Sequence, residues 1–115
     1  MEELNNEEMK EIDGGAWLKK NEKFTIKSNC RAYKVSDCKS VTAVDFKTKS
    51  ATYTTLAKGS IATVYSSNWY ALWDIDNPSK RILGNEGWNI ITVNGTRYFV
   101  QANVIKNGTR ITKSK

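Results

Sequence analysis

The sequence predicts a small all-β domain, a barrel or sandwich of six to seven short strands, preceded by a short acidic helix. Runs rich in β-branched and aromatic residues recur over residues 24–106, and turn residues separate them at intervals of about 8–12 residues. The chain has 115 residues, of which 39% are hydrophobic, and this suits one compact core. No apolar run approaches the length of about 18 residues that a membrane-spanning helix needs.

The first fifteen residues differ in charge from the rest of the chain. They carry a net charge of −5, whereas the whole chain carries +6, so the remaining residues carry +11. Leu4, Met9 and Ile12 fall near one face of a helix. Such a short helix is marginal alone and is stabilised when a partner covers its apolar face. Gly14 and Gly15 would end it and leave an extended backbone that fits a narrow protease cleft.

Residues 1–15 resemble the double-glycine leader of bacteriocins and related secreted peptides. The positions that this family uses for recognition and cleavage hold Leu4, Glu8, Met9, Ile12, Gly14 and Gly15. The resemblance implies cleavage after Gly15 by a peptidase-containing ABC transporter, with export of residues 16–115. The alternative is an ordinary N-terminal helix that a glycine caps.

Cys30 and Cys38 are the only cysteines, and the chain has no histidine. A zinc or haem site is therefore not expected, and no cofactor or metal is predicted. In an exported domain the pair predicts a disulfide, which would close a loop of about nine residues worth about 2.5 kcal/mol. Two reduced thiols, one or both buried, are the alternative, because the strand register cannot be read from the sequence.

After a short linker over residues 16–23, the strands are expected in the β domain of residues 24–106. The expected strand runs are KFTIKS, CRAYKV, SVTAVDF, ATYTTL, IATVYS, NWYALWDI, GWNIITV and TRYFVQA. Gly59 and the NPSK run are expected in turns, and Asn94-Gly95 predicts a two-residue type I′ hairpin. Asn107-Gly108 is expected to end the ordered region, and residues 107–115 are expected to form a basic flexible tail.

This β domain resembles bacterial SH3-like wall-binding modules, in particular the SLAP repeat of lactobacillar surface-layer proteins. The residues that carry the resemblance are Tyr53, Lys58-Gly59, Val64-Tyr65, Tyr98-Phe99 and Ala102-Asn103-Val104. It implies attachment to the Gram-positive wall through peptidoglycan or secondary polymers such as teichoic acids. The cysteine pair and the insertion WDIDNPSKRILGNEGW depart from the family pattern.

The charge of the β domain favours a polyanionic partner, and aromatic faces can stack on sugar rings. The candidate envelope-binding residues are Trp69, Tyr70, Trp73 and Trp88 for stacking, and Lys80, Arg81 and Arg97 for phosphate contacts. The alternative for each aromatic residue is a place in the core. Because a strand with one wet side cannot bury both faces of NWYALW, at least one of Trp69, Tyr70 and Trp73 is expected to be exposed.

These patterns predict a secreted, wall-associated, monomeric protein. The first hypothesis is a bacteriocin-like protein that acts at the Gram-positive envelope through its basic β domain; the second is a wall-binding or adhesion module that does not kill. The expected partners are an anionic wall polymer or peptidoglycan, with an anionic membrane surface as a further candidate. No nucleic-acid partner is expected, because no nucleic-acid-binding motif is present. No enzyme is expected, because the commonest general base, histidine, is absent.

Overall fold

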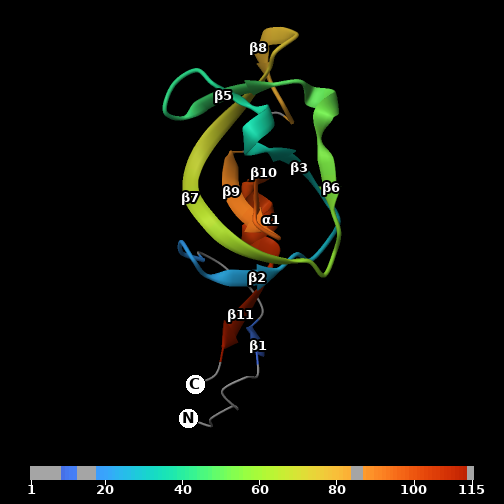
Figure 1. Ribbon diagram of the computed structural model, residues 1–115, viewed down its shortest axis with the longest axis vertical. Helices are drawn as coiled ribbons and strands as arrows, with labels where there is room; N and C mark the ends of the chain where they lie inside the picture. Colours follow the sequence, from blue (N-terminus) through green and yellow to red (C-terminus); the bar gives the residue numbers. More distant parts are fainter. Residues whose placement is uncertain (1–8, 13–17, 84–86, 114–115) are drawn as a thin grey trace.

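The computed structural model shows an all-β domain with one short α-helix, as the sequence predicts, and describes residues 9–12, 18–83 and 87–113 (Figure 1). The strands are β1 (Met9–Ile12), β2 (Lys23–Thr25), β3 (Cys30–Lys34), β4 (Lys39–Ser40), β5 (Asp45–Thr48), β6 (Thr54–Leu56), β7 (Ile61–Asp74), β8 (Asn77–Arg81), β9 (Trp88–Val93), β10 (Thr96–Gln101) and β11 (Thr109–Lys113). Two 3₁₀ turns, η1 (Val35–Asp37) and η2 (Ser50–Thr52), and the helix α1 (Ala102–Asn107) complete the described elements. The eleven strands exceed the six to seven expected, because many are only two to five residues long.

The long strand β7 organises the fold. The main path of the sheet runs β1-β11-β2-β7-β9-β10-β3-β6. The first part of β7 pairs with β2 and β9, whereas its end pairs with β5 in parallel and with β8 in antiparallel. The register against β9 shifts between Val64 and Ser66 and again between Ser66 and Tyr70. Such irregularities bend a strand, and β7 curves around β9 and β10 in Figure 1.

The curvature of β7 allows it to cover two hydrophobic clusters. Ala62 and Val64 pack in the first cluster, and Leu72 packs in the second. Strand β9 lies between the clusters and is buried on both faces, since Ile90 belongs to the second cluster and Ile91 to the first. At about 1.5–3 kcal/mol for each large apolar side chain, the buried residues of these clusters supply the main driving force for folding.

The Asn94-Gly95 hairpin is confirmed. Asn94 has φ 52° and Gly95 has φ 81°, the positive values that a type I′ turn requires. The turn joins β9 to β10, with Val93 opposite Thr96. The turn at Gly59 also has a positive φ of 90°.

Three sequence predictions differ from the structure. Over Met9–Ile12 the predicted leader helix is replaced by the strand β1, which pairs with β11; the other residues of the leader lie outside the described residues. The predicted flexible tail is wrong over Thr109–Lys113, because β11 pairs with both β1 and β2. The NPSK run lies in β8, and the chain turns just before it, at Ile75 and Asp76. Pairing between segments distant in the sequence explains the first two differences.

The predicted disulfide between Cys30 and Cys38 is also wrong, since both cysteines are free thiols. Strand β3 begins at Cys30 and extends to Lys34, and four extended steps span about 13 Å. The Cys38 thiol donates a hydrogen bond to the carbonyl oxygen of Lys34, with 3.4 Å between sulfur and oxygen. Cys38 therefore lies at the end of β3 opposite to Cys30. A disulfide needs Cα atoms within about 7 Å, so the extended strand separates the two residues. The two thiols also pack against different hydrophobic clusters.

Candidate functional site

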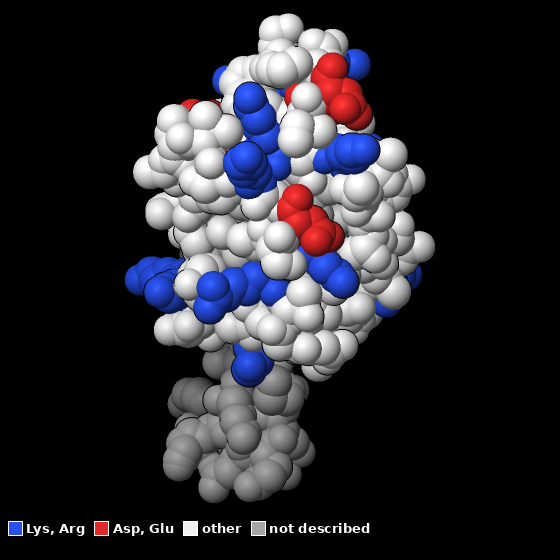
Figure 2. Space-filling model, turned by 45° about the horizontal axis from the view of Figure 1, so that its top comes forward, with Lys and Arg blue, Asp and Glu red and all other residues white. Residues whose placement is uncertain are grey.

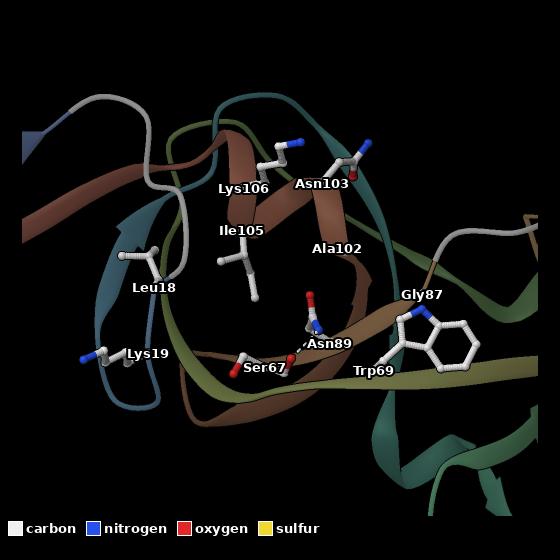
Figure 3. A pocket seen from close by; sticks show the side chains of 10 residues that line it. All are labelled: Leu18, Lys19, Ser67, Trp69, Gly87, Asn89, Ala102, Asn103, Ile105 and Lys106. Carbon is white, nitrogen blue, oxygen red and sulfur yellow. Dashed lines mark hydrogen bonds between the residues drawn. The ribbon is translucent and has the colours of Figure 1, made fainter.

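An open groove of about 700 Å³ lies where the middle of β7, the start of β9 and the helix α1 meet the segment before β2 (Figure 3). It is lined by Leu18, Lys19, Ser67, Trp69, Gly87, Asn89, Ala102, Asn103, Ile105 and Lys106. This volume lies in the range of about 300–1,000 Å³ that small-molecule sites occupy. In Figure 3 the groove runs from Leu18 and Lys19 at one end to Trp69 and Gly87 at the other. Aliphatic side chains form one wall, and polar groups lie on the floor.

Trp69 is the exposed aromatic residue that the sequence predicts within NWYALW. Its side chain is 48% exposed. The indole lies directly against Gly87, where an added Cβ would be only 1.9 Å from the indole nitrogen. Any side chain at position 87 would therefore displace the ring. No local pattern in the sequence indicates this role of Gly87, because the contact joins β7 to the chain just before β9.

Arg81 links Trp69 to Trp73. The guanidinium carbon of Arg81 lies 5.2 Å from the centre of the Trp69 ring and 5.3 Å from that of Trp73. Contacts at these distances are cation–π interactions. Arg81 is a predicted site residue, and the structure brings it together with two of the predicted tryptophans. We call Trp69, Arg81 and Trp73 the aromatic–arginine cluster.

Asp45 fixes the position of Trp73 within this cluster. The Trp73 indole N–H donates to Asp45 Oδ1 at 3.0 Å, and the Thr42 hydroxyl donates to Asp45 Oδ2 at 2.8 Å. These two hydrogen bonds, the Trp73 bond first, hold the pKa of Asp45 below its usual value because both stabilise the carboxylate. The negative charge that results lies near Arg81, which lowers the pKa further.

Tyr65 and Arg97 form a second contact between an aromatic ring and a cation. Arg97 lies 4.1 Å from the centre of the Tyr65 ring, and Lys20 lies 5.4 Å from it. Five such cation–π contacts occur among the described residues. The surface therefore interleaves aromatic rings with positive charge.

Two of the predicted stacking residues are not free to stack on a polymer. Trp88 is only 1% exposed and packs in the second hydrophobic cluster, edge-on to Tyr33. Tyr70 packs against the same cluster, and its hydroxyl shares a hydrogen bond with the Ser66 hydroxyl at 3.0 Å. The expectation of an exposed role was wrong for Trp88, since β9 is covered on both faces. Lys80 is exposed on β8 but makes none of the cation–π contacts described above.

Asn89 lies on the floor of the groove, and the sequence analysis did not select it. It is only 8% exposed. Its amide nitrogen donates to the carbonyl oxygens of Ser67 at 3.2 Å and Asn68 at 2.8 Å, across the irregular part of β7. The one available signal was a polar residue inside the apolar run WNIITV, because buried polar side chains need a specific reason.

Positive charge dominates the face shown in Figure 2, where lysine and arginine side chains surround a few acidic ones. At the groove itself, Lys19 and Lys106 contribute ammonium groups to the lining. Such a surface attracts anionic polymers over the range of a Debye length, about 8–10 Å at moderate salt.

The predicted leader residues contribute no geometry to a site. Leu4, Glu8, Gly14 and Gly15 lie outside the described residues, and Met9 and Ile12 belong to β1. Within the described ranges, no cluster of three or more His, Cys, Asp or Glu residues could hold a metal ion. The helical segments that the structure describes include none long and apolar enough to cross a bilayer.

No protein-family model, no curated protein and no solved structure gives a significant match to this chain. The fold and the groove themselves define a small basic all-β domain, with a groove that Trp69, Lys19 and Lys106 help to line.

Proposed function

We propose that this chain is a secreted, bacteriocin-like protein whose basic β domain binds a polymer of the Gram-positive cell envelope. The observation that carries the binding step is Trp69, which is half exposed, lies against Gly87 and stands at one end of an open groove. An aromatic face held in this way offers a rigid surface for the apolar face of a sugar ring.

Charge supports the same partner. Arg81 lies over Trp69, and Lys19 and Lys106 line the groove. Guanidinium and ammonium groups make strong, charge-assisted hydrogen bonds to phosphate and carboxylate oxygens. A polymer that combines sugar rings with phosphates or carboxylates would use both features, and peptidoglycan and teichoic acids have this composition.

Export is proposed from the sequence of residues 1–15, which resemble a double-glycine leader. Cleavage after Gly15 by a peptidase-containing ABC transporter would release the basic domain. Co-expression with such a transporter, followed by the intact mass of the exported protein, tests this step. The expected product begins at Ala16, and a secreted product that retains Met1 would contradict it.

The alternative is a wall-binding or adhesion module that does not kill. The observation that favours it is the folded β core, in which two buried clusters enclose apolar side chains from most of the strands. Among the described residues the one α-helix, α1, has only six residues, so it does not provide the long amphipathic helix of a simple membrane-disrupting peptide. Binding is common to both hypotheses, and only the outcome for the cell differs.

A sedimentation assay with viable counts tests binding and killing together. The full-length protein and the form that begins at Ala16 are added to Gram-positive cells at low salt, beside the variant Trp69→Ala. Tyr53→Ala is the matched control, because Tyr53 is also exposed and stacked on an arginine but does not line the groove.

We expect the wild type and Tyr53→Ala to sediment with the cells and Trp69→Ala to remain largely in solution. Sedimentation with fewer surviving cells supports the bacteriocin-like function, and sedimentation with full survival supports the non-killing module. Equal sedimentation of Trp69→Ala and the wild type would refute the groove as the binding site.

A further inference from the structure

The groove contains a buried hydrogen-bond acceptor that no described residue satisfies. The amide nitrogen of Asn89 donates to two carbonyl oxygens, those of Ser67 and Asn68, and this fixes the orientation of the amide. The amide oxygen must then point the other way. Figure 3 shows it directed into the hollow, toward Ile105. No donor from the described residues bonds this oxygen, although Asn89 is only 8% exposed.

Such an acceptor needs a hydrogen-bond partner, either water or a ligand, and a ligand that displaces water from it must supply a donor in its place. Here the open side of the groove leaves room for a ligand to provide it. The ligand therefore needs an N–H or O–H group that reaches the floor of the groove.

The surroundings of this acceptor restrict the ligand further. Leu18, Ala102 and Ile105 place aliphatic groups on the walls around the Asn89 amide. A donor that carries a small apolar group would fill this space. A free hydroxyl would leave the aliphatic walls uncovered, and a charged ammonium would lose its hydration. The acetamido group has this combination, because its N–H is joined through a carbonyl to a methyl group.

We propose that the groove binds an N-acetylated amino sugar, whose acetamido N–H donates to Asn89 Oδ1 while its methyl group packs near Leu18 and Ile105. This inference rests on the proposed envelope binding and names the sugar class that the same groove takes. Trp69 lies at the other end of the groove and would contact the next sugar of the chain. Lys106 on the lining would contact an acidic substituent of such a polymer.

The test compares three tetrasaccharides that share a β-1,4-linked backbone: the tetramer of N-acetylglucosamine, its de-N-acetylated form and the tetramer of glucose. Each is titrated into the full-length protein, and tryptophan fluorescence and the side-chain amide resonances of Asn89 report binding. We expect the N-acetylated tetramer to bind at least about tenfold more tightly than the other two, because only its acetamido group both donates to the Asn89 amide oxygen and covers the aliphatic walls with a methyl group.

Two variants assign the effect to Asn89. Asn89→Leu removes the acceptor and should abolish the preference for the N-acetylated tetramer. Asn29→Leu is the matched control, because the Asn29 amide oxygen accepts from the Lys58 N–H outside this groove. If Asn89→Leu fails to fold, the ligand comparison and the Asn89 resonances still decide.

The outcomes separate this inference from the proposed function. Equal binding of the three tetramers, or a shift at Trp69 without a shift at Asn89, would overturn the acetamido inference. If no tetramer binds but cells still sediment the protein through Trp69, the inference fails and the envelope function stands. If Trp69→Ala sediments normally and the N-acetylated tetramer binds through Asn89, the sugar site stands and the envelope function at this groove fails.

Discussion

The substitution Gly87→Ala is expected to weaken binding at the groove while leaving the fold in place. Gly87 is not among the residues with positive φ, so alanine meets no backbone strain there. The new Cβ would lie 1.9 Å from the indole nitrogen of Trp69 and 2.0 Å from Cδ1, far inside van der Waals contact. The indole must therefore move, and it would lose its place over Arg81.

The size of the effect follows from the contacts that are lost. An exposed cation–π contact is worth about 0.5–1 kcal/mol, so urea unfolding should show a loss of stability of that size. If the ring also provides a stacking contact of about 1 kcal/mol, the dissociation constant for the envelope polymer should rise about fivefold. Sedimentation with purified cell walls measures the binding, and the tryptophan emission spectrum reports the movement of the ring.

A double-mutant cycle provides the control. Because Gly87→Ala acts through Trp69, adding it to Trp69→Ala should cause no further loss of binding. Wild-type binding and an unchanged emission spectrum for Gly87→Ala would refute the reasoning, as would additive losses in the double variant.

Three further predictions concern the folded domain. Burial raises the pKa of the Cys38 thiol to about 11, so at pH 8 its alkylation should be about 100-fold slower than that of an ordinary thiol, and mass spectrometry of the labelled protein measures the rate; rapid labelling would contradict its burial. Because the pKa of Asp45 is lowered, its hydrogen bond to Trp73 should remain intact as the pH falls to 3.8, the usual carboxyl pKa. The bond should be lost only at lower pH, as the pH falls through the pKa of the folded state. The Trp73 indole N–H resonance reports this, and a transition above pH 3.8 would refute it. Ile111→Ala should cost about 2–4 kcal/mol in urea unfolding, since Ile111 is buried, whereas a change under about 0.5 kcal/mol would support the flexible tail.

Local chemistry in the sequence determined the parts of the fold that depend on neighbouring residues. The Asn94-Gly95 turn is one example, because the positive φ values of its two residues are a local preference. The β content is another, since alternating and β-branched runs favour extended backbone wherever the strand later pairs. The expected exposure of one aromatic residue in NWYALW also followed from strand geometry and is met by Trp69.

The tertiary structure alone decided which aromatic residue is exposed and which is core. Trp69 and Trp88 both lie in aromatic, β-rich runs of the sequence, yet Trp69 is half exposed and Trp88 is buried. Trp88 is buried because its strand, β9, lies between two clusters that distant segments complete. The pairing of β11 and the separation of Cys30 from Cys38 are likewise long-range outcomes. The groove belongs to the same category: its buried Asn89 acceptor exists because an irregular stretch of β7 presents two carbonyl oxygens to β9. Composition specifies the kinds of groups available to a site, and only the packing of distant strands places them together.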